Sequence, residues 1–419
     1  MFIQIVTKDR AGKLGMEILR LMSLLFMRKK IYVFVLLISA LTNITIAYYY
    51  DKNNPEPKLK KMHFYVKDSS LAKLSKLRDQ ALTLGVLMRS PNDYVKANIF
   101  YVNQSIECKL RLKGDWIDHL QDKKWSFRVK LKQSTSDGLK TFNITNPLSR
   151  GYLLGYVYHK LLRKEDILSP EYSFVEIYMN DVSWGIYVLE EHLTSRMISN
   201  QSEDDGVLLK FDDHEFFKAE TDESLSPSVG IIKKAKIRVY GSKSVRIEDQ
   251  GKLRIAKQII KNYQYQVDTL YNSFDAKKMG TYYAITDLAN AYHGIGWINM
   301  RFFFNFTTIK MEPVGYDGYP KMDWGKPYLG YNAKNAKLDS FDTKMIVYGA
   351  LNNQIIQKEY ISTLKKVTDS LYIQQFLEEE VSYLDYYEAE LQKHYPDYHF
   401  DNTFLFDNAR EIRELFINK

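Results

Sequence analysis

Residues 299–317, "NMRFFFNFTTIKMEPVGYD", have the pattern of a strand, a turn and a second strand. Asn299 stands at the entrance of this predicted hairpin and Asp317 at its exit. Both ends of a hairpin lie at the same edge, so we expect the two side chains to be close together. An amide oxygen beside a carboxylate suits Mg²⁺ with bound phosphate. Asn299 and Asp317 are therefore candidate metal ligands, with ordinary turn chemistry as the alternative explanation.

The elements on either side of this hairpin differ in their periodicity. Alternation with period two predicts strands at 62–68, 94–102, 106–113, 125–132, 139–144, 172–179 and 184–190, and helices are expected at 69–88 and 148–163. After residue 245 the period becomes helical, at 250–272, 276–292, 343–353, 369–395 and 405–417. These patterns predict an α+β protein with a sheet-rich lobe at 62–212, an insertion at 213–245 and a helical lobe at 246–419, separated by a cleft.

Residues 31–50, "IYVFVLLISALTNITIAYYY", carry no charge. Twenty residues at about 1.5 Å per residue span the roughly 30 Å hydrocarbon core of a bilayer. We expect one transmembrane signal anchor here, followed by a polar linker at 51–61. A cleaved signal peptide and a buried core helix are the alternatives. The long basic segment before the span and the lack of an A-x-A site before Asp51 argue against cleavage.

The net charge of +8 is concentrated in the tail at 1–30, which has seven basic residues and two acidic ones. The remaining chain carries only +3, so we expect no nucleic-acid partner. The basic tail predicts a cytoplasmic N-terminus and an extracytoplasmic body. The lack of a cysteine pair fits a protein of the bacterial envelope. Cys108 is the only cysteine, which excludes an internal disulfide and a cysteine-based metal site.

Cations alternate with apolar residues in "ECKLRLKG" and "WSFRVKLK", at Lys109, Arg111 and Lys113 and at Arg128, Lys130 and Lys132. Period two places each triplet on one face of its strand. If the strands are neighbours, these like charges repel unless solvent or an anion separates them. The faces are either a solvated outer surface or a phosphate-binding surface.

Residues 179–193, "MNDVSWGIYVLEEHL", predict a hairpin whose second strand ends at Glu190 and Glu191. A buried carboxylate there needs a cationic partner, and the lysine-bearing face could supply one. A carboxylate favoured by the start of a helix is the alternative. A glycan-modifying pair is disfavoured, because adjacent residues on a strand point to opposite faces.

The chain resembles the CotH (spore coat protein H) kinase-like family, an atypical branch of the protein-kinase fold. The resemblance rests on the order of "RLKGDW", "KKWSFRVKLK", "NDVSWGIYVLEEH", "GVLLKFD" and "NMRFFFNFTTIKMEPVGYD", within about residues 106–318. It implies a two-lobed kinase-like fold, ATP or another nucleotide with Mg²⁺, and phosphoryl transfer to a protein or glycan hydroxyl. It also implies that Arg128 or Lys130 meets nucleotide phosphates, with Lys113 a further candidate, that Glu191 pairs with a lysine, and that Asn299 and Asp317 hold the metal.

The family pattern places a proton-accepting aspartate five or six residues before the asparagine, where this chain has Gly294 and His293. Asp287 lies further upstream and is expected to be a helix-packing residue. His293 is therefore either the general base or part of a structural turn. The two corresponding functions are a phosphotransferase and an inactive pseudokinase that scaffolds envelope or exopolysaccharide assembly. An extracytoplasmic body, where ATP is scarce, favours the second.

Overall fold

The computed structural model describes residues 57–121, 123–202, 204–221, 231–240, 245–265, 272–320, 328–332, 347 and 349–417. The expected anchor at 31–50 and the basic tail lie outside these residues. Among the residues described, no helix is both long enough and apolar enough to cross a bilayer. The described part is a mixed α+β protein, as the sequence predicts.

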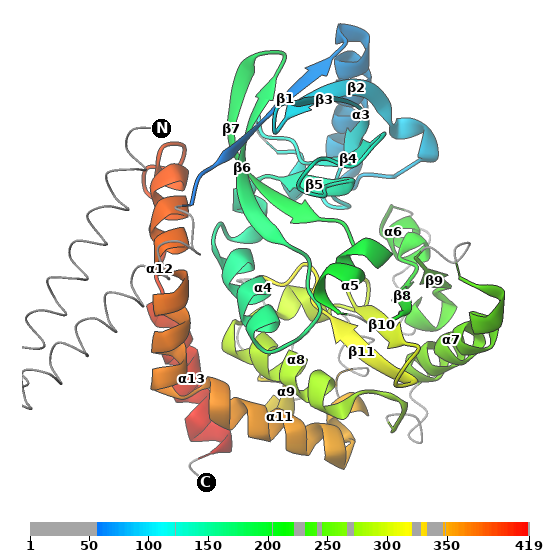
Figure 1. The fold of residues 1–419 in the computed structure, drawn as a ribbon, viewed down its shortest axis with the longest axis vertical. Coiled ribbons are helices and arrows are strands. Elements are labelled where there is room, and N and C mark those ends of the chain that lie inside the picture. Colours follow the sequence, from blue (N-terminus) through cyan, green and yellow to red (C-terminus); the bar gives the residue numbers. More distant parts are fainter. Residues whose placement is uncertain are drawn as a thin grey trace, which may run out of the picture. The chain divides into compact units, whose positions relative to one another are not determined.

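Seven strands close into a barrel in the order β1-β2-β3-β4-β5-β7-β6 (Figure 1). The strands are β1 (Lys60–Val66), β2 (Val95–Tyr101), β3 (Gln104–Leu112), β4 (Phe127–Leu131), β5 (Thr141–Thr145), β6 (Tyr172–Met179) and β7 (Val182–Glu191). Alternate residues point inward, so Leu110, Val129 and Phe142 are fully buried in the barrel core. Helix α3 (Asp68–Leu84) buries Leu74 and Ala81 in the same core. The barrel is closed by parallel pairing of β1 with β6.

A second sheet has the order β11-β10-β8-β9. Its strands are β8 (Gly206–Phe211), β9 (Ile237–Val239), β10 (Arg301–Asn305) and β11 (Lys310–Val314). The hairpin predicted at 299–317 is confirmed, because Arg301 pairs with Val314 and Asn305 with Lys310. Part of the region expected to be an insertion belongs to this sheet, since β9 pairs with β8. Asn299 and Asp317 therefore flank the hairpin at one edge of a four-stranded sheet.

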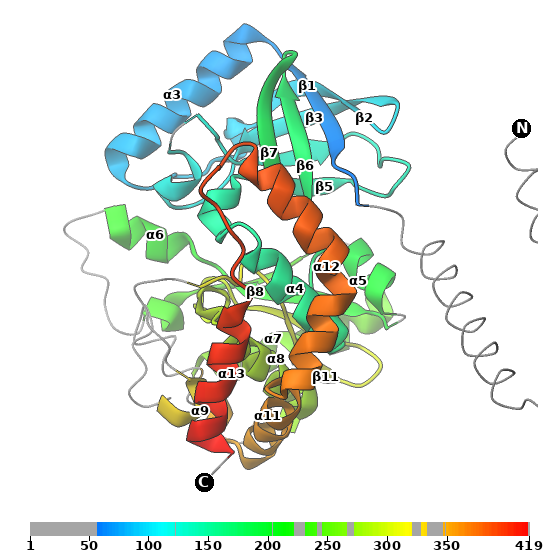
Figure 2. The same ribbon diagram turned by 90° about the vertical axis from the view of Figure 1, so that its left-hand side faces the viewer.

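The helices are α4 (Leu154–Lys164), α5 (Ser195–Gln201), α6 (His214–Thr221), α7 (Gln250–Gln264), α8 (Ala276–Leu288), α9 (Leu329–Asn332), α11 (Gln354–Val367), α12 (Ser370–Gln392) and α13 (Thr403–Phe416). Helix α8 is central, since every residue from Met279 to Leu288 is buried. It packs against α4, α11 and α13. Figure 2 shows α12 and α13 beside one another, and the two helices are in contact.

Several helices are shorter than the sequence predicts, α3 among them, and two of these differences bear on the cavity. The helix expected at 148–163 is a 3-10 turn at Pro147–Arg150 followed by α4, because Gly151 (φ 63°) and Tyr152 (φ 56°) take the left-handed conformation between them. Helix α8 ends at Leu288, before Asn290, whose φ is 52°. These left-handed residues change the direction of the chain close to Arg150 in one case and close to His293 in the other, and both of these residues line the cavity.

Asp287 is fully buried on α8 and is a packing residue, as expected. Its carboxylate accepts hydrogen bonds from the Tyr292 hydroxyl at 2.8 Å, the Tyr360 hydroxyl at 2.5 Å and the backbone N–H of Leu329 at 3.0 Å. Burial raises the pKa of Asp287 to about 6, although these three donors act in the opposite direction. The group ties α8 to α11 and to the short helix α9.

The raised pKa of Asp287 predicts a pH dependence of stability. In the unfolded chain an aspartate titrates near 3.9, so between about pH 4 and about pH 6 the folded state binds more protons. The free energy of unfolding should therefore fall as the pH rises through this window. Urea unfolding of the wild type and of Asp287→Asn at pH 4 and pH 6.5 measures this change in the free energy of unfolding. We expect the variant to lack this part of the slope; identical slopes would contradict the assignment.

Candidate functional site

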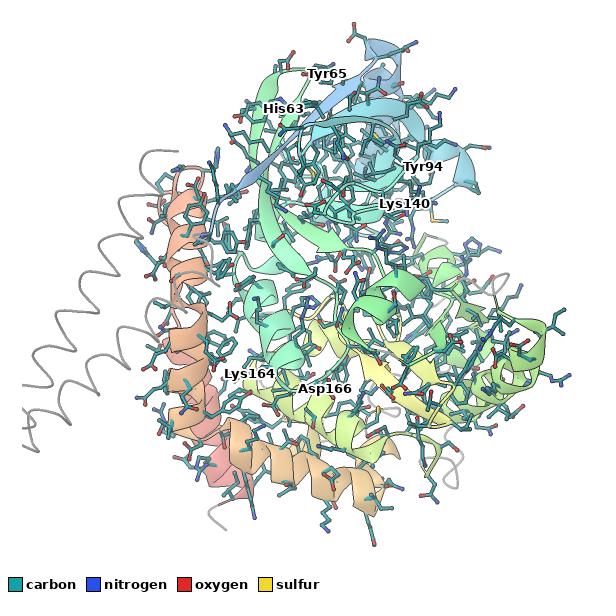
Figure 3. All side chains as sticks on the ribbon, viewed as in Figure 1. His63, Tyr65, Tyr94, Lys140, Lys164 and Asp166 are labelled. Carbon is teal, nitrogen blue, oxygen red and sulfur yellow. The ribbon has the colours of Figure 1, made fainter. Side chains whose placement is uncertain are left out.

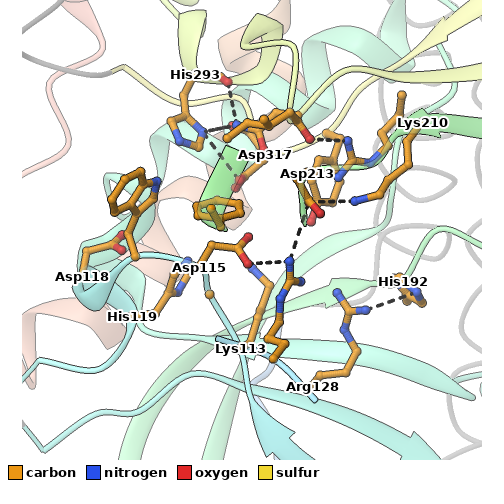
Figure 4. Close-up of a pocket in the computed structure, with 18 of the residues that line it drawn as sticks. Lys113, Asp115, Asp118, His119, Arg128, His192, Lys210, Asp213, His293 and Asp317 are labelled. Atoms are coloured by element: carbon orange, nitrogen blue, oxygen red, sulfur yellow. Dashed lines mark hydrogen bonds and ion pairs between the residues drawn. The ribbon is translucent and has the colours of Figure 1, made fainter. Parts of the chain in front are cut away.

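A cavity of about 760 Å³ is lined by residues of both the barrel and the second sheet (Figure 4). Its lining is strongly cationic. Eight basic side chains, Arg89, Arg111, Lys113, Arg128, Arg150, Lys210, Arg238 and Arg301, face four carboxylates, Asp115, Asp118, Asp213 and Asp317. An excess of fixed positive charge in a concave site attracts anionic ligands and raises their local concentration.

His293 and Asp317 meet at one corner of this cavity (Figure 4), and Asn299 contacts His293 there. The Asn299 amide donates to the carbonyl oxygen of His293 at 3.0 Å. Nδ1 of His293 lies 2.9 Å from the carbonyl oxygen of Asp317 and 3.5 Å from its carboxylate. The hairpin thus brings its entrance and its exit together around one histidine.

These contacts assign the tautomer of His293. A proton on Nδ1 faces the Asp317 carbonyl at 2.9 Å and its carboxylate at 3.5 Å. A lone pair there would serve only the Asn299 amide at 3.2 Å, which already donates to the His293 carbonyl. The two acceptors therefore favour the tautomer with the proton on Nδ1. In the neutral ring the lone pair is then on Nε2. His293 packs its ring on Tyr319, with the centroids 4.4 Å apart. Its geometry is that of an oriented imidazole that presents Nε2 as the basic atom.

Asp317 is buried, with 8 % of its surface exposed. A carboxylate at the mouth of a hairpin is usually open to solvent, but an ion pair keeps Asp317 inside: Nε of Arg150 lies 2.6 Å from Oδ1. Burial opposes ionisation, yet Arg150, His293 and Lys113 together lower the pKa of Asp317 to about 2. Its carboxylate is therefore charged at every physiological pH.

Arg150 is fixed on several sides. Nη2 donates to Nε2 of His119 at 2.9 Å, Nη1 donates to the carbonyl of Ser149 at 2.7 Å, and the guanidinium stacks on Tyr319 at 5.1 Å. His119 is neutral, because burial and the charge of Arg150 lower its pKa well below the usual value. The loop that precedes His119 packs against the imidazole ring of His119 at position 114. Only glycine fits there, because φ is +107° and a Cβ would lie 2.2 Å from His119.

Lys113 lies on the barrel side of the cavity and is buried. Its Nζ lies 3.8 Å from Oε2 of Glu190, which also accepts a 2.7 Å hydrogen bond from Asn143. Burial, followed by the charge of Arg150, lowers the pKa of Lys113 to about 8. The structure places Glu190, rather than the expected Glu191, beside this lysine. Glu191 is half-buried at the end of β7 and does not line the cavity.

The two glutamates form a matched pair for a stability test. Glu190→Ala leaves Lys113 buried without its carboxylate, a change that costs roughly 3–5 kcal/mol. Glu191→Ala removes a half-exposed carboxylate with no ion pair within the described residues, so we expect at most about 1 kcal/mol. Urea unfolding of both variants measures the difference. Equal losses would mean that the buried pair does not support the barrel.

The predicted alignment of cations on β3 and β4 is confirmed, because Lys109 lies opposite Lys130 and Arg111 opposite Arg128. The cations on this face of β3 and β4 have two different environments. Arg111, Lys113 and Arg128 line the cavity, whereas Lys109, Lys130 and Lys132 are exposed to solvent. Nζ of Lys130 lies 4.6 Å from the ring centre of Tyr94, the residue just before β2 (Figure 3). Both the solvated surface and the anion-facing surface are therefore present on one pair of strands.

The donor set at the Asn299 corner fits Mg²⁺ only as a partial site. Asp317 supplies a charged carboxylate and Asn299 an amide oxygen, both hard ligands, within one corner of the cavity. In the described residues no group of three or more His, Cys, Asp or Glu side chains could hold a metal. Mg²⁺ characteristically binds through one or two carboxylates and completes its shell with water and substrate phosphate. These residues therefore suit a metal that arrives with a phosphate ligand.

Several cavity residues were not predicted. Arg150 was assigned to a helix, and no pattern indicated its pairing with Asp317. A second polar cluster joins the barrel to the second sheet: Arg89 contacts Asp115, and Asp213 lies 2.8 Å from Lys210 and 3.7 Å from Arg89. The sequence signal for it is "GVLLKFD", in which Lys210 stands near the end of the strand β8, just before acidic residues.

Comparison with known protein families shows which family the chain belongs to. No curated protein is significantly similar to it. Residues 110–414 match the family described as CotH kinase protein. The match extends well beyond residue 318, where the recognisable sequence motifs end, and there includes α11, α12 and most of α13. The chain belongs to the CotH kinase protein family.

Proposed function

We propose that this protein is a membrane-anchored phosphotransferase that moves a phosphoryl group from a nucleotide to a hydroxyl of a protein or glycan. The observation that carries the proposal is the cavity. One charged aspartate, one asparagine and one oriented histidine share it with eight basic side chains. Phosphoryl transfer needs this combination, because its catalysis rests on positioning and on neutralising negative charge.

Each residue has a role in this proposal. Lys113 and Arg128 contact the nucleotide phosphates, and Glu190 holds Lys113 in place. Asp317 and Asn299 are the ligands for Mg²⁺, which when bound neutralises charge on the phosphates. Nε2 of His293 accepts the proton of the acceptor hydroxyl. Lys130 and Glu191 lie outside the cavity, so we give them no role in binding the nucleotide.

The proposed location follows from the sequence alone. The anchor at 31–50 and the basic tail before it place the folded body outside the cytoplasm, at the surface of a bacterial envelope. Protein and glycan hydroxyls of that surface are the proposed acceptors, and nucleic acid is not a partner. A reporter enzyme that is active only outside the cytoplasm, fused after Lys419, tests the orientation directly.

The activity is tested with the full-length protein in detergent micelles, labelled nucleoside triphosphate, Mg²⁺ and purified envelope polymers. We expect label to reach a polymer only when Mg²⁺ is present, and not with Asp317→Asn. Absence of nucleotide binding at millimolar concentration would end the proposal.

A pseudokinase scaffold is the second candidate, favoured by the absence of an aspartate at positions 293 and 294. Installing that carboxylate discriminates between the two functions. His293→Asp is the better variant, because a Cβ on Gly294 would lie 2.9 Å from the carbonyl oxygen of Tyr316. Transfer that appears only in His293→Asp favours the scaffold. Transfer by the wild type that falls in His293→Asp favours the enzyme.

A further inference from the structure

Three of the eight cavity cations differ from the others in their partners. Arg89, Lys113, Arg150, Lys210 and Arg238 each have a carboxylate within 4.0 Å. Arg111, Arg128 and Arg301 have none among the described residues, although all three line the cavity. Buried or half-buried charges without a counterion are costly to a fold, so this concentration needs an explanation.

Two of these arginines lie on the barrel and repel each other. Arg111 on β3 is directly opposite Arg128 on β4. Their contacts are neutral: Nη1 of Arg111 donates to the carbonyl of Leu112 at 2.8 Å, and Nε of Arg128 donates to Asn143 at 2.6 Å. The charge of Arg128, after burial itself, lowers the pKa of Arg111. Like charges directly opposite on adjacent strands destabilise a sheet unless an anion separates them.

Arg301 reaches the same cavity from the second sheet. It is 6 % exposed, and its Nη1 donates to the carbonyls of Ile298 at 2.8 Å and Met300 at 2.9 Å. Its guanidinium stacks on Tyr316 at 4.3 Å. Nε of Arg301 is a buried donor with no acceptor in the described part of the chain. A buried donor of this kind normally has a partner, which is absent from the protein alone.

His192 supplies a second orphaned donor. Its Nε2 lies 3.3 Å from Nη1 of Arg128, which can only donate, so Nε2 accepts and Nδ1 carries the proton. Nδ1 is buried and has no hydrogen-bond partner among the described residues. His192 also lines the cavity. Nε of Arg301 and Nδ1 of His192 are therefore two buried donors of one cavity that have no acceptor among the described residues.

We infer that Arg111, Arg128 and Arg301, with His192, form a phosphate-binding subsite of this cavity that does not include Asn299 or Asp317. Guanidinium groups bind tetrahedral oxyanions through paired N–H donors, and an anion would separate the opposed charges of Arg111 and Arg128. Lys113 follows Arg111 by two residues, which places the subsite roughly 6–7 Å along the strand from the lysine. The phosphate comes either from the nucleotide or from an acceptor that is itself a phosphate ester.

This inference does not require phosphoryl transfer, so it can be tested without metal or catalysis. Inorganic phosphate is titrated into the full-length wild type in Mg²⁺-free buffer and followed by calorimetry. We expect Arg111→Gln and Arg301→Lys to weaken binding by at least about 10-fold, because each loses a charge-assisted fork. Arg238→Gln is the matched control: it lines the same cavity but has a 62 % exposed side chain paired with Asp212. It should change the affinity by less than about 3-fold.

The source of the phosphate is found by repeating the titration with saturating Mg²⁺ and ATP. Phosphate that still binds identifies the subsite as the place of an acceptor's phosphate, whereas stoichiometric displacement assigns it to the nucleotide. Both results support the subsite. Thermal melting of each variant identifies one that fails to fold. Arg111→Gln, which loses one bond to a carbonyl and the packing of Arg111 on Tyr94, is the safer of the two. A wild type that binds no phosphate at tens of millimolar, or folded variants with wild-type affinity, would overturn the inference.

Discussion

Asp317→Asn should abolish Mg²⁺-dependent nucleotide binding and also destabilise the fold. Asp317 is a charged carboxylate beside His293 at the Asn299 corner, and a carboxylate is a hard metal ligand. Loss of a direct ligand should exceed the roughly 10–100-fold in affinity that an outer-shell partner contributes. The same change leaves Arg150 buried with 6 % exposure and without its nearest counterion. Breaking a buried pair in this way costs roughly 3–5 kcal/mol.

The pH profile gives an independent readout of Asp317. Its pKa is about 2 in the folded protein and near 3.9 in an unfolded chain. Its stabilising contribution is therefore complete above about pH 4 and is lost as the pH falls toward 2. Asp317→Asn should lack this part of the acid sensitivity.

Asp118→Asn is the control for both measurements. Asp118 lines the same cavity and lies 3.8 Å from Arg150, but its side chain is 42 % exposed. We expect nearly wild-type nucleotide affinity and a loss of stability of no more than about 1 kcal/mol. If Asp317→Asn and Asp118→Asn behave alike, the corner is not a metal site.

His293→Ala should lower turnover by roughly 10²–10⁴-fold while nucleotide affinity is kept, because a general base acts on the acceptor rather than on the donor. His293→Gln separates this role from a structural one. The amide of glutamine can still donate to the Asp317 carbonyl, as Nδ1 does at 2.9 Å, but it cannot accept a proton.

The two variants of His293 together distinguish a general base from a structural residue. If the histidine is the base, both should lose turnover and both should melt near the wild-type temperature. If it only orders the turn, His293→Ala should melt lower, and His293→Gln should restore both the melting temperature and the turnover. Full activity in His293→Ala would remove this residue from the mechanism.

The strands, the hairpin at 299–317 and the family were predictable because they depend on local periodicity and on the order of short motifs. The partner of Lys113 was not. Residues Gly185–Glu190 of β7 are all buried, so alternation does not show whether Glu190 or Glu191 faces the lysine. Barrel closure depends on parallel pairing between β1 and β6, which are distant in sequence. Arg150 was missed because two left-handed residues break an otherwise helical pattern.

Arg150 also changes the expectation for the metal corner. Position in a hairpin suggests that a carboxylate is open to solvent, whereas the ion pair with Arg150 depends on a turn about 170 residues earlier in the chain. Such a contact leaves no trace in local spacing. The expected transmembrane anchor is a separate case, since it lies outside the described residues and stays a prediction.

The most direct measurement is calorimetric titration of ATP into the full-length wild type, once with Mg²⁺ and once with EDTA. The proposed site has only two protein ligands for the metal and a surplus of cations for the phosphates, so nucleotide and Mg²⁺ should bind together. We expect saturable binding with Mg²⁺ and affinity at least about 10-fold weaker with EDTA, a difference that Asp317→Asn removes. No binding at millimolar ATP, or the same affinity with and without Mg²⁺, would contradict the assignment of this cavity as a metal-dependent nucleotide site.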